Sequence, residues 1–290
     1  MRYRSSLTAL ALLLLVPTLV DAQRRYDDDE LDGYEVCRPI WREYGRSMNG
    51  RARAVFCEVR EIGVMPKSER LDFDGGSWTG VRVTGAKRSD VRVRLVVQAQ
   101  SRTVAEAREL AKNVKLDISS LPLRVEGLRN RSGRNDDDYD DRHWVSAVVV
   151  LEVPEQSNLR LRTQYAPLDV ENVTGRMELD GTYGPVNLRD VGGDVRARVD
   201  YGPLNVDLGG AKWQGAGLDA EASYGPMTLR VPRNFGADLE IGADHGPLDV
   251  DFPLTVRRFD RSLIETKLGE GGPRVRAVAR YGPMSLKMAR

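Results

Sequence analysis

Apolar and polar residues alternate along the C-terminal half of the chain, from Leu161 onward. The segments 195–199 and 204–208 read Val-Arg-Ala-Arg-Val and Leu-Asn-Val-Asp-Leu, so every second side chain is apolar. This alternation predicts short strands that turn one face toward a core. Because Gly and Pro separate the alternating segments, each repeat is expected to be two strands joined by a turn.

An aromatic residue followed by Gly and Pro recurs between these segments. Four copies are complete and two are degenerate, and their first residues are Tyr165, Tyr183, Tyr201, Tyr224, His245 and Tyr281. The spacings are 18, 18, 23, 21 and 36 residues, and the last is twice 18, as if one copy had been lost. A loop at 209–217 accounts for the spacing of 23, and residues 255–272 account for the missing copy. One structural unit is therefore about 18 residues.

A period near 18 predicts an all-β fold of the β-solenoid class, a stack of β-helix-like coils around a narrow core. The period is too short for a propeller blade of about 40 residues, and it lacks the helical half of a leucine-rich repeat. Gly would supply the backbone angles of a sharp corner, and Pro would remove an N–H where the chain leaves the ladder.

The six aromatic positions are predicted to stack as a ladder along one edge, because coils lie about 4.8 Å apart. Two interpretations of Tyr165, Tyr183, Tyr201, Tyr224, His245 and Tyr281 stay open. The rings form a stack that only stabilises the fold, or they form an exposed strip that binds sugar rings.

Residues 58–160 carry a different pattern. Strands are predicted at 81–83, 91–97, 115–118 and 123–125, and the apolar run 144–153 fits a buried strand. One helix is predicted, from Val104 to Asn113, because Thr103 and Glu106 have capping-box spacing. We interpret residues 58–160 as the start of the sheet system that residues 161–290 continue, with the helix over the open end of the core.

The opposite end of the stack has no obvious cap in the sequence. Met284, Leu286 and Met288 lie in the last unit, and the chain ends shortly after them. Exposed strand edges can pair with other chains. Self-assembly of the protein is therefore one expectation.

The N-terminus has the features of a signal peptide. Arg2 and Arg4 precede an apolar stretch that ends at Val20, and small residues follow up to Ala22. Residues 1–22 are therefore predicted to be cleaved, which places the protein in the periplasm, at the cell surface or outside the cell. The stretch is too short for a membrane span of about 20 residues, and no stable span is expected after cleavage.

Cys37 and Cys57 are the two cysteines of the chain. In an oxidising compartment we expect them to form a disulfide that closes the N-terminal extension, residues 23–57. Two unpaired buried thiols are the alternative.

Composition removes several classes of function. Lys plus Arg number 44 and Asp plus Glu 43, so no electrostatic field favours nucleic acid. His143 and His245 are the two candidate bases, and no nucleophile, metal or phosphate-binding motif accompanies them. No catalytic residue, cofactor or metal is assigned. Asp136, Asp138 and Asp140 form a weak candidate Ca²⁺ site, with a solvated loop as the alternative.

Several segments resemble the bacterial putative-adhesin family. They are 57–61, 88–91, 103–107, 211–213 with 217–218, 229–232 and 268–273, and the resemblance covers residues 58–290. It implies an exported β-solenoid and carries no catalytic residues. The family commonly has Asn-Gly at the corners where this chain has Tyr-Gly-Pro, so any ligand tied to those Asn side chains is not implied here.

The expected function is that of a non-enzymatic, adhesin-like interaction or structural module of the cell envelope. An envelope polysaccharide or an envelope protein is the expected partner. The alternatives are a polysaccharide lyase or hydrolase on the same scaffold, which would need two paired carboxylates, and a self-assembling envelope scaffold.

Overall fold

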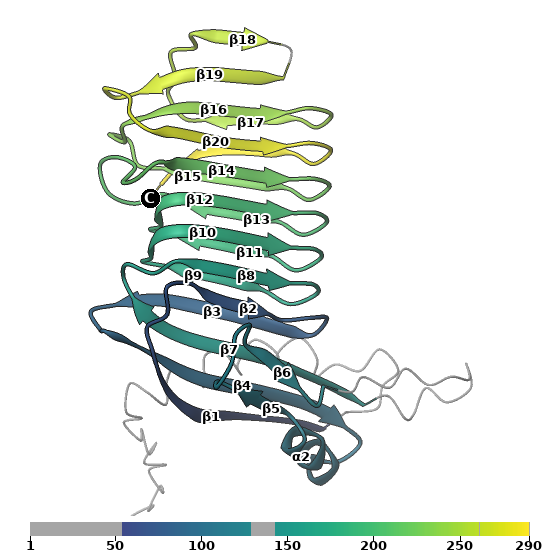
Figure 1. The fold of residues 1–290 in the computed structure, drawn as a ribbon. Coiled ribbons are helices and arrows are strands. Elements are labelled where there is room, and N and C mark those ends of the chain that lie inside the picture. The colour runs from purple at the N-terminus through teal and green to yellow at the C-terminus, as the bar shows by residue number, and fades with distance from the viewer. Residues whose placement is uncertain (1–53, 129–142, 261, 290) are drawn as a thin grey trace, which may run out of the picture.

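The structure is a computed structural model that describes residues 54–128, 143–260 and 262–289 (Figure 1). The predicted signal peptide, Cys37 and the Asp136, Asp138 and Asp140 loop lie outside these residues. Among the described residues, no helix is long and apolar enough to cross a membrane.

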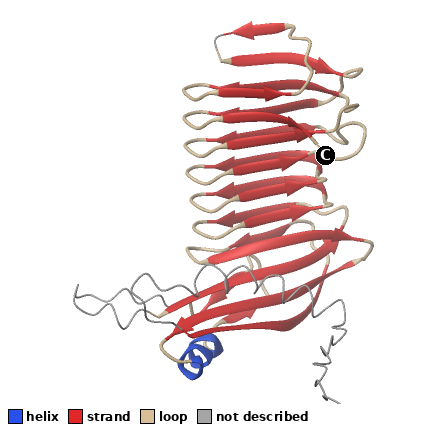
Figure 2. Cartoon of the chain, turned by 180° about the vertical axis from the view of Figure 1, so that it is seen from behind, coloured by secondary structure: helices blue, strands red, loops and turns tan. Residues whose placement is uncertain are grey.

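Two large sheets and one short hairpin make up the fold (Figure 2). The ten-stranded sheet has the order β1 (Ala54–Pro66), β4 (Asp90–Ser101), β7 (Trp144–Pro154), β3 (Thr79–Ala86), β9 (Leu168–Glu171), β11 (Val186–Arg189), β13 (Leu204–Asp207), β15 (Met227–Val231), β21 (Met284–Met288) and β17 (Leu248–Asp251). The nine-stranded sheet has the order β18 (Arg258–Asp260), β19 (Leu263–Leu268), β16 (Ala237–Ala243), β20 (Arg274–Ala279), β14 (Gly217–Ala222), β12 (Gly192–Val199), β10 (Thr174–Gly181), β8 (Leu159–Thr163) and β2 (Leu71–Asp74). The hairpin joins β5 (Lys115–Asp117) to β6 (Arg124–Glu126). The all-β prediction is confirmed, and both sheets are mixed.

Parallel pairing in the middle of the sheets follows the sequence repeat. Leu179 of β10 pairs with Leu161 of β8 and with Ala197 of β12, so each strand lies beside the strand 18 residues away. The chain runs from a strand of the nine-stranded sheet through a turn to a strand of the ten-stranded sheet. Every second side chain of these strands is buried, and the two sheets enclose one continuous core.

The spatial order of the last two units differs from their order in the sequence. β20 lies between β14 and β16, and β21 lies between β15 and β17. The C-terminal unit β20–β21 is therefore inserted between two units that precede it in the chain. The expectation that the 36-residue gap marks a lost copy in a regular series is wrong, because the chain passes the end of the stack and returns.

The excursion between these units covers the end of the core. β19 pairs antiparallel with β16, and β18 pairs antiparallel with β19. Phe252 and Leu254 pack against the core. The expectation of an uncapped end at Met284, Leu286 and Met288 is wrong, since their strand lies inside the sheet.

The other end carries the one helix among the described residues, α2 (Val104–Lys112). Its boundaries agree with the prediction to within one residue, and Thr103 Oγ1 accepts a hydrogen bond from the Glu106 N–H at 3.2 Å. Ala107 and Ala111 are buried, and the helix packs against β1 and β4. α2 lies at the β1 and β4 end of the molecule (Figure 1), and its buried residues belong to the core.

Arg276 joins the inserted strand β20 to both of its neighbours. Its Nη1 donates to Asp219 of β14 at 2.8 Å, and its Nε donates to Glu240 of β16 at 3.2 Å. Burial lowers the pKa of Arg276, but the hydrogen bond to Asp219 and the charges of Asp219, Glu240 and Glu221 outweigh it and raise the pKa above its ordinary value. Arg276 is therefore charged at neutral pH.

Replacing Arg276 with Met is expected to lower the free energy of unfolding by about 1 to 2 kcal/mol, because charge-assisted hydrogen bonds to two strands are lost. Arg196→Met is the matched control, since Arg196 approaches the same Asp219 at 3.9 Å but is 60% exposed. Its loss should cost less than about 0.5 kcal/mol. Urea unfolding of both variants tests this, and equal midpoints would contradict it.

Candidate functional site

The predicted aromatic residues stack in one continuous ladder at the turns between the sheets. Successive ring centroids are 4.7 to 5.0 Å apart, and the ring planes differ by 6° to 17°. Trp78, in the turn between β2 and β3, extends the ladder at 5.1 Å from Tyr165. The spatial order is Trp78, Tyr165, Tyr183, Tyr201, Tyr224, Tyr281 and His245.

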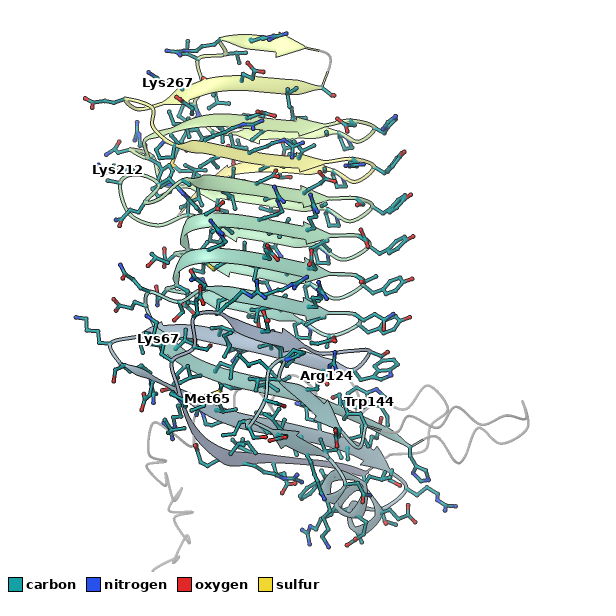
Figure 3. All side chains as sticks on the ribbon, in the orientation of Figure 1. Met65, Lys67, Arg124, Trp144, Lys212 and Lys267 are labelled. Atoms are coloured by element: carbon teal, nitrogen blue, oxygen red, sulfur yellow. The ribbon has the colours of Figure 1, made fainter. Side chains whose placement is uncertain are left out.

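A row of side chains with rings projects from the turns between the sheets at the right-hand edge of Figure 3. The five tyrosines are 46% to 55% exposed. Since the faces of each tyrosine ring are covered by the neighbouring rings, its exposed part is the ring edge that carries the phenol hydroxyl. Ring edges are the electropositive part of an aromatic side chain, and the hydroxyl both donates and accepts. The ladder therefore presents a row of polar ring edges, one for each turn between the two sheets.

The corner glycines explain why the turns approach so closely. A Cβ on Gly202 would lie 2.1 Å from the Gly184 carbonyl oxygen, and a Cβ on Gly282 would lie 2.0 Å from that of Gly225. No corner glycine has a positive φ. The expectation that Gly supplies unusual backbone angles here is therefore wrong, and Gly is needed because no side chain fits between stacked turns.

Ala166 stands where the later turns have Gly, because no turn with the same motif precedes it in the stack. In each later turn the space for a Cβ is filled by the preceding turn, and Gly184 would meet the Ala166 oxygen at 2.2 Å. Ala166 belongs to the first unit that carries the motif, and the turn before it contains Trp78 and has a different sequence. The degenerate copy at residues 165–167 thus marks the beginning of the regular turns.

The two histidines lie in different places. His245 forms the last ring of the ladder, stacked 4.8 Å from Tyr281. His143 Nδ1 lies 2.9 Å from Ser101 Oγ, and that hydroxyl donates to Glu106 Oε2 at 2.7 Å. This bond is the main cause of a lowered pKa for Glu106.

The Ser101, His143 and Glu106 cluster lacks the features of a nucleophile with its base. Because the serine hydroxyl donates to the carboxylate, the histidine Nδ1–H is left to donate to Ser101, which is the reverse of the direction that activates a serine. Ser101 is also 1% exposed, so a substrate cannot reach it. The cluster joins the start of α2 to the start of β7.

Metal and disulfide predictions are not tested by the described residues. These residues contain no group of three or more His, Cys, Asp or Glu side chains that could hold a metal ion, but Asp136, Asp138 and Asp140 lie outside them. Cys57 is on β1, and none of the described cysteines is free. Since Cys37 is not described, its pairing with Cys57 stays a prediction.

Trp78 is the member of the ladder that sequence reasoning missed. Its turn lacks the Tyr-Gly-Pro motif, so the repeat search does not find it. A weaker signal is present, since Trp78 lies between the alternating segments 71–74 and 79–86, as each tyrosine does in its own unit.

Comparisons with known proteins find likeness at the level of structure. No family model and no curated protein matches the chain. A putative cell adhesion protein from Clostridium sporogenes is 11% identical, with a TM-score of 0.42 over 81% of this chain and 100% of that chain. A putative adhesin from Bacteroides fragilis is 9% identical, with a TM-score of 0.32 over 82% and 99%. A putative lipid-binding protein from Parabacteroides distasonis is 11% identical, with a TM-score of 0.33 over 79% and 96%. At these scores the likeness carries no argument about function.

Proposed function

We propose that the protein is an exported, non-enzymatic β-solenoid that binds an oxygen-rich polymer of the cell envelope along its aromatic ladder. The observation that carries the proposal is the ladder itself, seven stacked and exposed rings in one line. Six gaps of about 4.8 Å make a strip of about 29 Å. A strip of this length with a regular spacing suits a repetitive partner better than a small molecule.

The exposed edges favour a polysaccharide as that polymer. Phenol hydroxyls can donate to and accept from sugar hydroxyls, and the electropositive ring edges attract oxygen atoms. In the described part of the chain, the tyrosine hydroxyls of the ladder form no hydrogen bond that would occupy them. Since neighbouring rings cover the ring faces, sugar rings would bind across the exposed ring edges.

End-to-end assembly is less well supported than polymer binding. In the described residues the terminal strand β1 pairs antiparallel with β4 at one end of the stack, and β18 pairs antiparallel with β19 at the other. The register of β1 is irregular between Glu61 and Gly63. The last strand of the ten-stranded sheet, β17, is four residues long and is flanked by Pro247 and Pro253. Short edges, bulges and prolines are features that prevent edge pairing.

A ladder variant separates binding from stability. Tyr201→Ser is expected to lower the free energy of unfolding by about 1 kcal/mol, since the ring is half exposed and two stacking contacts are lost. In the triple variant with Tyr183 and Tyr224 also changed to Ser, retention on purified peptidoglycan sacculi or on exopolysaccharide should fall at least tenfold. The measurement is co-sedimentation of residues 23–290 with each polymer.

The control replaces the same three tyrosines with Phe, which keeps the stack and removes the hydroxyls. An intermediate loss of retention would assign part of the binding to the hydroxyl row. If the triple Ser variant is folded and is retained as well as the unchanged protein, the ladder is not the binding surface. Shortening of the polymer chains would contradict the non-enzymatic assignment.

A further inference from the structure

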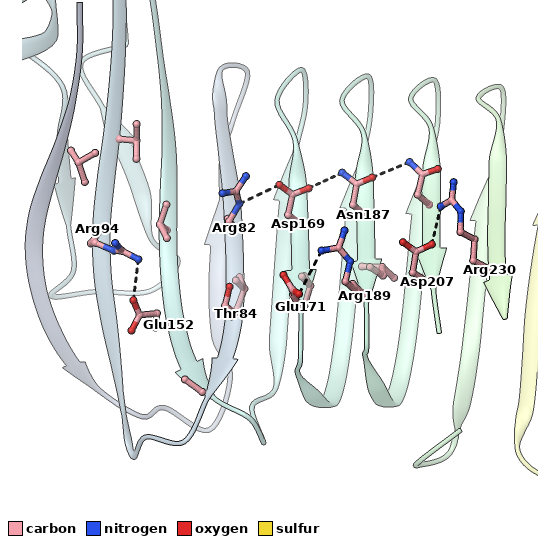
Figure 4. A pocket seen from close by; sticks show the side chains of 18 residues that line it. Arg82, Thr84, Arg94, Glu152, Asp169, Glu171, Asn187, Arg189, Asp207 and Arg230 are labelled. Atoms are coloured by element: carbon pink, nitrogen blue, oxygen red, sulfur yellow. Dashed lines mark hydrogen bonds and ion pairs between the residues drawn. The ribbon is translucent and has the colours of Figure 1, made fainter. Parts of the chain in front are cut away.

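A groove of about 910 Å³ lies on the outer face of the ten-stranded sheet (Figure 4). Its floor is formed by β3, β9, β11 and β13, and its wall by β1, β4 and β7. The strands are already paired within the sheet, so their backbone N–H and C=O groups are occupied. Recognition in this groove must therefore depend on side chains.

The first row of polar side chains crosses the floor from strand to strand. Arg82 Nε lies 3.6 Å from Asp169 Oδ2, Asn187 Nδ2 donates to Asp169 Oδ1 at 2.7 Å, and Asn205 Nδ2 donates to Asn187 Oδ1 at 2.9 Å. These residues occupy matching positions of adjacent strands. An amide has two N–H donors and an oxygen with two lone pairs, so each Asn keeps capacity for a ligand.

A second row lies two residues further along the same strands. Arg189 Nη1 approaches Glu171 Oε1 at 3.5 Å, and Arg230 Nη1 donates to Asp207 Oδ1 at 2.8 Å. Of the charged residues that line the groove, four are Arg and four are Asp or Glu. Because these charges cancel, the groove has no net field that would attract an anion.

Apolar side chains form part of the wall. Val59, Val96 and Val150 line the groove. Val96 and Val150 are buried, so Val59, which is 39% exposed, supplies most of the apolar surface. They give a limited apolar surface beside the two polar rows. Such a surface is too small and too polar in its surroundings for an acyl chain, whose binding depends on buried apolar area.

We propose that this groove binds a neutral oligosaccharide. Adjacent sugar hydroxyls are a donor and acceptor pair that the planar Asn187, Asn205 and Asp169 groups can bind together. A C–H face of a sugar suits the exposed Val59. The volume is within the range of small-ligand sites, about 300 to 1,000 Å³. The regular spacing of the first row suits an oligomer with equivalent hydroxyls on successive units.

This site is separate from the aromatic ladder. Tyr183 lies in the turn before β11, whereas Asn187 is the second residue of that strand. None of the ladder residues is among the described residues that line the groove. The inference therefore goes beyond the proposed function, and either one can fail without the other.

Titration with defined oligosaccharides tests the groove. Residues 23–290 are titrated by calorimetry with cellotetraose, maltotetraose and chitotetraose, each to about 10 mM, which reaches dissociation constants in the millimolar range. Trigalacturonate and a tetra-alanine peptide are the anionic and peptide probes. At least one neutral tetrasaccharide should bind, and Asn187→Leu with Asn205→Leu should weaken its binding at least tenfold while the ladder triple variant leaves it unchanged.

The control is Arg196→Leu on the outer face of the nine-stranded sheet, which should bind as the unchanged protein does. Thermal melting shows whether each variant is folded, and Asn187→Asp with Asn205→Asp is the second variant if the leucine pair unfolds. No binding of any neutral probe, tighter binding of trigalacturonate or of the peptide, or binding that the groove variants do not change would each overturn the proposal.

Discussion

Gly202→Ala is expected to destabilise the protein by about 3 kcal/mol, because the new methyl group would overlap backbone that cannot move aside. The added Cβ would lie 2.1 Å from the Gly184 oxygen and 2.9 Å from the Tyr183 oxygen. To make room, adjacent turns must separate. This would weaken the bond from the Val186 N–H to the Pro203 oxygen, now 2.9 Å, and the stacking of Tyr183 on Tyr201, now 4.9 Å.

Ala166→Gly is the matched control for this substitution. It changes the equivalent residue of the first motif-bearing turn, where a methyl group already fits, and its effect should stay below about 1 kcal/mol. Urea unfolding of both variants, with tyrosine fluorescence to follow the ladder, provides the comparison. If Gly202→Ala unfolds at the same urea concentration as the unchanged protein, the close approach of the turns is not what requires glycine.

Deletion of residues 273–290 is expected to release the whole end of the stack. β20 and β21 each pair on both sides, so their loss separates β14 and β15 from β16 and β17. Val275, Met284 and Leu286 are fully buried, and the burial of these three side chains alone contributes about 6 kcal/mol. That is comparable with the net stability of a typical domain, about 5 to 15 kcal/mol.

Hydrogen exchange shows how far the deletion acts. Amides of β16 and β19 should lose protection at least a hundredfold, whereas those of β8 and β10 should keep most of theirs, because interactions in a stack are between neighbours. Deletion of the last two residues is the control and should change neither. The prediction is contradicted if β16 keeps its protection, which would mean that it docks directly on β14 and closes the gap.

The sequence repeat predicted much of the fold, for a physical reason. Alternation with period 2 specifies which face of each strand is buried, and the 18-residue spacing specifies which strands are neighbours. Val195, Ala197 and Val199 are accordingly buried, while Arg196 and Arg198 point outward. Thr103 and Glu106 likewise located the start of α2, because their side-chain and backbone contacts are local.

The order of the last units could not be predicted from the same signals. Strands β14, β16 and β20 have nearly the same alternation, so each would bury its apolar face equally well beside either of the others. What distinguishes the arrangements is the path of residues 251–272 and the pairing of Arg276 with Asp219 and Glu240. Both depend on contacts between residues far apart in the sequence.

The candidate sites also differ in how far the sequence predicts them. The ladder follows from a motif, so its tyrosines were identified, but the exposure of the rings depends on how the turns project from the stack. The groove carries no motif at all. Arg82, Asp169, Asn187 and Asn205 come from four strands, and the curvature of β4 and β7 beside them has no signature in the alternating pattern.

The inserted C-terminal unit has a consequence for how the chain reaches its native state. During synthesis the N-terminal residues emerge first, so β16 and β17 are made before the strands that separate them from β14 and β15. They must either wait without their neighbours β20 and β21 or dock in the wrong place and leave again. A linear array of repeats can grow from one end as each unit appears, whereas here the last strands to be made enter between units that already exist. The insertion of β20 and β21 is therefore a late step of folding, and it joins β14 and β15 to β16 and β17.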